Sequence, residues 1–529
     1  MRRYFFIILF LVVLVAPFLL RLMVGGGGDG NAARRQSPRR LVVMTPHSEG
    51  IRREFQDGFS DWLKSRNEPD VFIDYRNLGG GANDIVKYFD ANASLYPSTK
   101  TFGIDLVWGG GDYLFDEQLK KPTSFPGGYL QKVALPPGVL KAAYPTPDIG
   151  GVPLYDEGGC WFGTALSAFG IVYNKDVLRT RGLPEPKTWA DLADPRYQGW
   201  LVLADPSRSA SVKTAFMTIV ERSMADAWEA DAAAQAKHAD LKKQQAAAEA
   251  ANDAKAAAGH KAAAYAVYQA AMDPGWRRGM GLIRQIASNT RVFTDNSASV
   301  PGTVGSGDAA AGMAIDFYGR TEVQSVGADR VGYVEPAGAT IVNPDPIAVV
   351  RRDDTDSPAA RDQLALAVKF VEFILSEPGQ RLWNTRAGAP GGPRETALYR
   401  RPIVRSAYGD TTNFTDRVNV FEVAGSFNTR RDRRDTNPIL AELIQASCLD
   451  LLDELKDTRR AILASPRAAE LDARLGTFPF GQAEALARQA AYVGTKAKPV
   501  PPIDRLATMR RWEDEFAAEY AGLRAEAAK

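Results

Sequence analysis

Short apolar runs that lead directly into helical patterns recur along the first part of the chain. Residues 41–44 are apolar, and the apolar residues between positions 51 and 62 then fall three or four apart, as on one face of a helix. The same order of strand, turn and helix begins again at residues 71–75 and at residues 104–108. This repetition predicts a mainly parallel α/β sheet whose turns gather along one edge.

The turns after these strands carry the first group of candidate ligand-binding residues. A strand that passes straight into a helix leaves backbone N–H groups free, and such groups attract anions. Neither glycine run in these turns has the spacing of a dinucleotide-binding or P-loop motif, so nucleotide binding is excluded. The candidates are His47, Ser48, Glu49, Gly80, Gly81, Asn83, Gly110 and Asp112.

A second group of candidates follows strands in the middle of the chain. Residues 200–204 predict a strand and residues 212–222 a helix, with a polar turn between them. Residues 309–315 predict a buried strand. Asp316, Tyr318 and Arg320 follow it at alternate positions, which on an extended chain would place them on one face. The candidates are therefore Asp205, Ser207, Ser209, Asp316, Tyr318 and Arg320.

Seven segments of the chain carry a resemblance to a known family. They are, in order, TPHSEGIRREF, DYRNLGGGANDIVKYF, DLVWGGGDYLF, WFGTALSAFGIVYNKDVL, LADPSRSASVKTAF, GDAAAGMAIDFYGR and VKFVEFILSEPGQRLW. In the same order they resemble the type 2 periplasmic solute-binding proteins, in the extracellular family that includes the ferric-iron-binding and related anion-binding components of ABC transporters. The resemblance implies two α/β lobes joined by crossing strands, with the ligand held between them and closure at a hinge.

The resemblance divides the chain into two lobes. The chain departs from the family pattern in an insertion at residues 224–272 and beyond residue 408. We expect residues 41–165 and 338–529 to form the first lobe and residues 166–337 the second. The alanine-rich insertion 224–272 has high helix propensity but little apolar surface, which predicts a solvated helical arm or hairpin. Helical patterns continue beyond residue 408, and we expect them to pack on the first lobe or to form a small separate module.

The N-terminal segment has the features of an export signal. An uncharged apolar run at residues 4–20 follows Arg2 and Arg3 and just reaches spanning length, about 17 to 25 residues. We interpret residues 1–24 as a signal anchor, with a cleaved signal peptide as the alternative, and residues 25–40 as a flexible tether. This interpretation predicts a periplasmic or extracytoplasmic protein anchored to the inner membrane.

Composition narrows the range of partners and of chemistry. The chain has 529 residues and a net charge of +2, which fits a protein of several domains and gives no sign of a nucleic-acid partner. Cys160 and Cys448 lack metal-binding spacing, and whether they form a disulfide is open. Of the three histidines, only His47 lies outside the alanine-rich tract.

Two ligand classes remain for a substrate-binding component that delivers its ligand to an ABC permease. The first is ferric iron or a ferric-anion complex. Ferric ion is a hard cation that prefers oxygen donors, and the residues for it would be His47, Glu49, Asp316 and Tyr318. Ferric members of the family typically have two adjacent tyrosines where this chain has Phe317 and Tyr318. A phosphorylated or carboxylated small anion is the alternative, because turn N–H groups, serine hydroxyls and the cation Arg320 suit it.

Other classes of function are less well supported by the sequence. No nucleophile elbow or metalloprotease motif occurs, so we expect neither enzymatic activity nor a cofactor. A membrane-anchored ligand sensor, which would signal through the inserted arm, is a further alternative to a transporter component.

Overall fold

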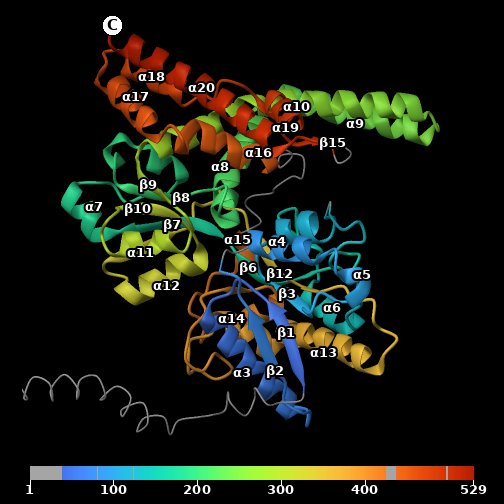
Figure 1. Ribbon diagram of the computed structural model, residues 1–529. Coiled ribbons are helices and arrows are strands. Elements are labelled where there is room, and N and C mark those ends of the chain that lie inside the picture. Colours follow the sequence, from blue (N-terminus) through green and yellow to red (C-terminus); the bar gives the residue numbers. More distant parts are fainter. Residues whose placement is uncertain (1–38, 80–81, 123, 424–436, 496–497) are drawn as a thin grey trace, which may run out of the picture.

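The computed structural model contains two α/β lobes and a layer of C-terminal helices (Figure 1). It describes residues 39–79, 82–122, 124–423, 437–495 and 498–529. The predicted signal anchor and nearly all of the tether lie outside the described residues. Within the described residues, no helix combines the length and the apolar character needed to cross a membrane.

The sheet of the first lobe is built from the strand and helix units expected from the sequence. Strand β1 pairs in parallel with both β2 and β3, whereas β12 runs antiparallel to β3 and to β6. The strand order is β13-β6-β12-β3-β1-β2. The strands are β1 (Arg40–Met44), β2 (Phe72–Arg76), β3 (Leu106–Trp108), β6 (Phe162–Ser167), β12 (Asn343–Val349) and β13 (Arg401–Pro402).

Helices cover this sheet through aromatic contacts. The apolar positions predicted for the first helix are buried on α3, where the ring centroid of Phe55 lies 4.4 Å from that of Trp383 on α14. The helices are α3 (Glu49–Ser65), α4 (Ala82–Asn92), α5 (Tyr96–Thr99), α6 (Pro137–Ala143), α13 (Pro358–Leu375), α14 (Glu377–Asn384) and α15 (Val420–Val423), with a π-helical turn at Leu114–Leu119. Two short strands, β4 (Asp148–Ile149) and β5 (Val152–Pro153), form a separate hairpin.

The chain passes between the lobes at Ala168. Strand β6 ends at Ser167 in the first sheet, and β7 (Phe169–Asn174) begins one residue later in the second sheet. The returning segment is tied to the crossing at Thr340, because the backbone N–H of Phe169 donates to Thr340 Oγ1 at 3.0 Å. The apolar run at residues 161–174 therefore forms β6 and β7 and carries the chain from one lobe to the other.

The second lobe has its own sheet, in the order β11-β7-β10-β8-β9. Strand β8 runs parallel to β9 and β10, and β7 runs antiparallel to β10 and β11. The strands are β8 (Leu201–Ala204), β9 (Thr290–Thr294), β10 (Ala311–Ile315) and β11 (Val331–Val334). The helices next to them are α7 (Lys175–Arg181), α8 (Ala210–Ala230), α11 (Ser299–Gly305) and α12 (Asp316–Val326).

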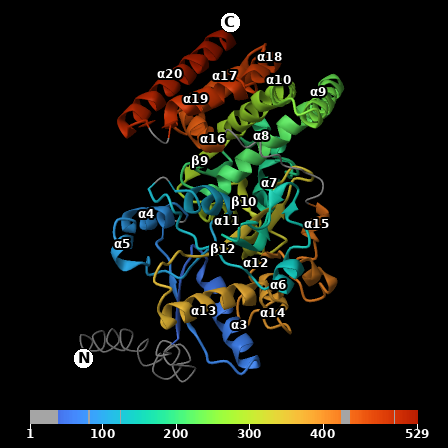
Figure 2. The ribbon, with the colours of Figure 1, turned by 90° about the vertical axis from the view of Figure 1, so that its right-hand side faces the viewer.

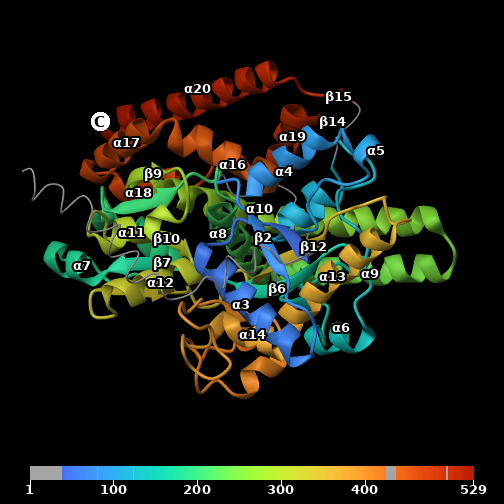
Figure 3. The same cartoon turned by 60° about the horizontal axis from the view of Figure 1, so that its bottom comes forward.

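The alanine-rich insertion forms a helical hairpin. Helix α9 (Ala232–Ala250) packs on the first half of α10 (Ala254–Ser288), and α9 has no buried residue. Figure 3 shows the pair extending away from the two sheets. The second half of α10, from about Trp276, is buried against the second lobe. The arm is thus exposed at its tip and anchored at its base.

The C-terminal helices pack on the second lobe, so the expectation that they pack on the first lobe is wrong. They lie over α8 and α10 (Figure 2) and share the core of the second lobe through residues such as Phe478, Phe516 and Tyr520. The sequence patterns indicate helices here, but a helical pattern does not specify which surface of the protein the helices will cover. The helices are α16 (Asn437–Ile444), α17 (Leu452–Ala464), α18 (Ala468–Leu475), α19 (Gln482–Val493) and α20 (Pro502–Ala527).

Buried arginines fix this extension to the second lobe. Arg284 on α10 is fully buried and donates to both carboxylate oxygens of Glu519, at 3.0 and 2.9 Å, and to the carbonyl oxygens of Leu475 and Thr477. The two cysteines do not pair: Cys160 and Cys448 are both buried free thiols. Cys448 lies within the extension, in the π-helical turn Gln445–Leu449.

Candidate functional site

A buried cluster of His47, Asp345 and Arg400 lies where the first lobe meets the second. His47 follows β1, Asp345 belongs to β12, and Arg400 precedes β13. His47 Nε2 lies 2.7 Å from Asp345 Oδ2 and 3.0 Å from Arg400 Nη1, and Arg400 Nη1 donates to Asp345 Oδ2 at 2.5 Å. The sequence singled out His47 alone, because nothing local to Asp345 or Arg400 indicates that the fold brings them to it.

The glycine turn after β3 closes around this cluster. The backbone N–H of Gly110 donates to Asp345 Oδ1 at 3.0 Å. Gly109 has a φ of +91°, and a Cβ atom there would lie 2.7 Å from His47 Nε2, so a larger residue would not fit. Asp112, at the end of the same turn, accepts from Asn343 Nδ2 at 3.3 Å. Gly110 and Asp112 therefore hold the first-lobe edge together.

The charge states within the cluster follow from burial and pairing. Burial lowers the pKa of His47, and the neighbouring Asp345 only partly opposes this shift. Burial alone would raise the pKa of Asp345, but Arg400 and His47 outweigh it and hold that pKa well below its usual range. At neutral pH the cluster is a carboxylate paired with a guanidinium beside a neutral imidazole. Within the described residues, His47 Nδ1 and Arg400 Nε are buried without a hydrogen-bond partner.

Helix α12 of the second lobe places the ring of Phe317 against this cluster, and Tyr318 follows it. The Cζ atom of Arg400 lies 4.3 Å from the centroid of the Phe317 ring. Burial raises the pKa of Tyr318, and the charges of Arg400 and Asp345 also act on its hydroxyl, in opposite directions. Arg400 is thus one point at which side chains of the two lobes meet.

The expected extended arrangement of Asp316, Tyr318 and Arg320 is wrong. Strand β10 ends at Ile315 and α12 begins at Asp316, so the three residues lie on a helix. Positions four apart share a helix face, whereas a position two along points elsewhere. Asp316 and Arg320 therefore face one side together, and Tyr318 lies on a different part of the helix surface, where the charges of Arg400 and Asp345 act on its hydroxyl.

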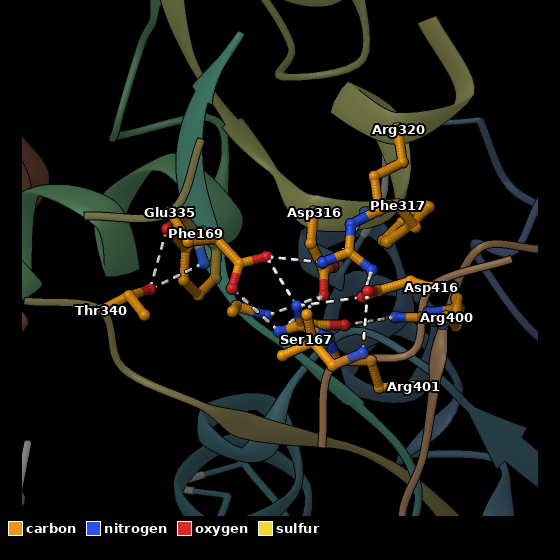
Figure 4. A network of polar contacts seen from close by, with 12 residues as sticks. Ser167, Phe169, Asp316, Phe317, Arg320, Glu335, Thr340, Arg400, Arg401 and Asp416 are labelled. Carbon is orange, nitrogen blue, oxygen red and sulfur yellow. Dashed lines mark hydrogen bonds and ion pairs between the residues drawn. The ribbon is translucent and has the colours of Figure 1, made fainter. Parts of the chain in front are cut away.

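Asp316 and Arg320 take part in an ion network that joins the lobes (Figure 4). Arg320 donates to Glu335 Oε1 at 2.9 Å and to Asp416. Arg401 donates to both oxygens of Glu335, at 3.0 and 2.9 Å, and to Asp416 Oδ2 at 3.3 Å, and it lies 3.9 Å from Asp316. Arg401 and Asp416 come from the first lobe and the other three residues from the second. The network is a charged link between lobes next to the crossing strand.

The backbone also holds Asp316 in place. Its carboxylate accepts from the N–H groups of Ala168, at 3.1 Å, and Phe317, at 2.8 Å. Burial raises the pKa of Asp316, while Arg401 and Arg320 lower it. Asp316 therefore ties the first turn of α12 to the crossing residue Ala168.

The remaining predicted residues are distributed around these features. Ser48 and Glu49 are exposed at the start of α3, and Ser48 makes no side-chain capping bond there. Asp205 Oδ1 accepts from the backbone N–H and the hydroxyl of Ser207, both at 2.7 Å. Ser209 caps α8 by accepting from Val212 N at 3.5 Å. Gly80, Gly81 and the side chain of Asn83 lie outside the described part.

The four residues considered for a metal do not gather at one point. Glu49 is exposed, Asp316 is held by Ala168 and Arg401, and His47 is paired with Asp345. In the part of the chain that the structure describes, no group of three or more His, Cys, Asp and Glu side chains is placed to hold a metal ion.

A second cation lies at the junction between the lobes. Lys213, in the first turn of α8, has its Nζ atom 4.7 Å from the centroid of the Tyr113 ring. Tyr113 follows the glycine turn of the first lobe, and both side chains are partly exposed. Burial lowers the pKa of Lys213. Neither residue was a candidate from the sequence, although a lysine one turn after a serine-rich helix start is a signal that could have been used.

A cavity of about 430 Å³ opens elsewhere on the first lobe. It is lined mainly by apolar side chains and the backbone of two glycines, and it contains none of the residues described above. Its lining includes Val133, Leu135, Leu140, Tyr155, Gly158, Gly159 and Phe162.

Comparisons with known proteins support the family resemblance. Residues 152–274 match a family described as bacterial extracellular solute-binding protein. Phosphoglycerate transport regulatory protein PgtC of Salmonella typhimurium is 47% identical over 45 residues, a match that spans 8% of this chain and 11% of the relative.

The chain also resembles solved structures of periplasmic binding proteins. AfuA of Actinobacillus pleuropneumoniae is 15% identical, with a TM-score of 0.49, and the match covers 78% of this chain and 99% of AfuA. Ferric ion-binding protein A of Pasteurella haemolytica is 14% identical, with a TM-score of 0.43, over 79% of this chain and 98% of that protein.

Proposed function

Because residues 152–274 match the family of bacterial extracellular solute-binding proteins, we propose that the chain captures a small phosphorylated or carboxylated anion between its lobes. Solute-binding proteins of this kind deliver small ligands to ABC permeases, and we assign the same partner to this chain. The expected location is the periplasm, with the N-terminal segment as a membrane anchor.

The observation that carries the proposal is that a cation of each lobe meets an aromatic ring of the other. Arg400 of the first lobe packs on Phe317, and Lys213 of the second lobe packs on Tyr113. Charges at a partly buried junction act more strongly than in water, because the effective dielectric constant is lower. An anion held between the lobes would interact with cations from both, so binding would favour closure.

The same residues weaken the case for ferric ion. Arg400 would place a positive charge beside His47 and Asp345, where a trivalent cation would need to bind. Phe317 offers no phenolate, and burial raises the pKa of the neighbouring Tyr318. Ferric ion prefers negatively charged oxygen donors, and the donors here are already paired with cations.

The name of the curated relative suggests both a first probe and a second function. Its name joins phosphoglycerate to transport regulation, and phosphoglycerate carries a phosphate and a carboxylate. The match is short, so the name gives a starting point for experiments. A ligand sensor that regulates transport is the second candidate function.

Calorimetry on the full-length protein tests the proposal. We expect binding of at least one of 3-phosphoglycerate, glycerol 3-phosphate and glycerate, with a loss of affinity of about tenfold or more in Lys213→Met. The matched control is Lys237→Met, which changes an exposed lysine of the arm. Binding of ferric citrate alone would establish the ferric alternative, and binding of none of these would refute the proposal. Loss of ligand uptake in a deletion strain would separate a transport component from a sensor.

A further inference from the structure

We propose that the C-terminal extension forms part of the ligand site: Glu442 of α16 faces Lys213 and Tyr113 and selects anions that also carry a hydroxyl or ammonium group. This inference rests on the proposed function, since it concerns the same junction between the lobes. It assigns a role in recognition to a part of the chain that lies beyond the segments resembling the family.

The packing of α16 places Glu442 at the edge of the second lobe. Helix α16 lies against α8, the helix that carries Lys213 (Figure 1). Ile439, Leu440 and Leu443 are buried in the core of the second lobe, with exposed fractions of 2% or less. Glu442, adjacent to this buried face, is only partly exposed. The core thus fixes the position of the Glu442 backbone beside α8.

Glu442 interacts electrostatically with residues of both lobes and of the C-terminal extension. Lys213 of α8 and Arg505 of α20 both attract its carboxylate. Its negative charge also acts on Tyr113 of the first lobe and on Tyr492 of α19, and it contributes to raising the pKa of each. Lys213 itself lies over the Tyr113 ring. The carboxylate is therefore located where the two lobes and the extension come together.

One oxygen of this carboxylate lacks a hydrogen bond. Among the described residues, Glu442 Oε2 is buried and has no donor. Burial raises the pKa of Glu442, and the two cations oppose that rise. A buried carboxylate oxygen without a donor is costly, so a ligand group that donates to it would add to binding. The cost is removed when a ligand brings that donor.

The arrangement favours one chemical class of ligand. The anionic group of the ligand would be attracted by Lys213, and a hydroxyl or ammonium group on the same molecule would donate to Glu442. An anion without such a donor would be repelled by the Glu442 carboxylate and would leave Oε2 without a hydrogen bond. We therefore assign the site to compact organic phosphates or carboxylates that carry a hydroxyl or ammonium group.

Pairs of probes that differ only in the donor test this inference on the full-length protein. Glycerol 3-phosphate and propyl phosphate are three-carbon phosphate esters with and without hydroxyl groups. Phosphoethanolamine and ethyl phosphate differ in the same way in an ammonium group, and glycerate and propionate supply the carboxylate pair. By calorimetry we expect the wild-type protein to prefer the donor-bearing member of at least one pair by about tenfold or more.

Substitution of Glu442 should abolish that preference. In Glu442→Ala and in the isosteric Glu442→Gln we expect the preference within the pair to fall, to about twofold or less in the alanine variant. Glu454→Ala, an exposed glutamate of α17, is the matched control and should keep the preference. If both Glu442 variants kept the preference, or if the wild-type protein bound probes but did not prefer the donor-bearing member of any pair, this inference would be overturned and the proposed function would remain intact. If the wild-type protein bound no probe of either class, the proposed function itself would fail.

Discussion

Arg400 of the first lobe packs its guanidinium over the ring of Phe317 of the second lobe, at 4.3 Å. The same guanidinium donates to Asp345 and to Ser167, so the first-lobe edge holds it rigidly. The family resemblance implies that Phe317 corresponds to a position at which ferric members typically have another tyrosine. In this chain the side chain at that position packs against a cation.

Removing this aromatic face should weaken ligand binding. A cation over a desolvated aromatic ring contributes up to about 2 kcal/mol, so we expect Phe317→Leu to lower anion affinity by about 3- to 30-fold. Phe421→Leu is the matched control, because Arg405 packs on Phe421 at 4.4 Å within the first lobe alone. Calorimetry with the ligand identified for the wild-type protein measures both. Equal losses in the two variants would show that the interlobe contact has no specific role.

Stability should fall in mild acid because of His47. Its pKa is lowered in the folded state, so below about pH 6.5 the unfolded chain takes up a proton that the folded chain does not. Without ligand, we expect this residue to reduce the free energy of unfolding by up to about 1.4 kcal/mol per pH unit below that value. Asp345, whose pKa is lowered, adds its own loss only below about pH 4.

Urea unfolding between pH 8 and pH 5 measures the contribution of His47. The variant His47→Gln should lose much of the dependence on pH between 6.5 and 5, whereas His260→Gln, in the alanine-rich arm, should keep it. A wild-type protein as stable at pH 5 as at pH 7 would contradict the assignment of a neutral, buried imidazole.

The ion network beside the crossing strand should be sensitive to loss of one partner. Arg401 is almost fully buried and donates to Glu335 and Asp416 from opposite lobes. Arg401→Met leaves Glu335 and Asp416 with Arg320 and removes a guanidinium that lies 3.9 Å from the buried Asp316, so we expect it to reduce the free energy of unfolding by up to about 5 kcal/mol. Arg467→Met removes an exposed pair with Glu470 and should cost less than about 1 kcal/mol. Similar costs in urea unfolding would mean that the network adds no more than a surface ion pair.

The sequence predicts those elements whose pattern of apolar residues repeats within the element itself. The apolar residues of β1 and α3 repeat with the period of their own element, so both were placed to within a few residues. In the first five residues of α12, the polar positions fit the two-residue repeat of a strand as well as the 3.6-residue repeat of a helix. The sequence therefore predicts an extended chain beyond Ile315, where the structure has a helix. His47 and Arg400 are 353 positions apart, and only the folded sheet brings them together.

Deleting the tip of the α9–α10 hairpin should have little effect on stability, whereas deleting the C-terminal extension should prevent stable folding. Removing residues 241–263 shortens the exposed hairpin of α9 and α10, and we expect the free energy of unfolding to change by less than about 1 kcal/mol because α9 buries no residue. Ending the chain at Val423 removes the helices that share the core of the second lobe and bring Glu519 to Arg284. That deletion would expose a large apolar surface and remove the carboxylate and carbonyl partners of Arg284, so we expect the shortened chain to be insoluble or unfolded. Solubility, circular dichroism and urea unfolding of the two variants make the comparison. A stable, cooperatively folded chain ending at Val423 would show that the second lobe does not depend on the extension.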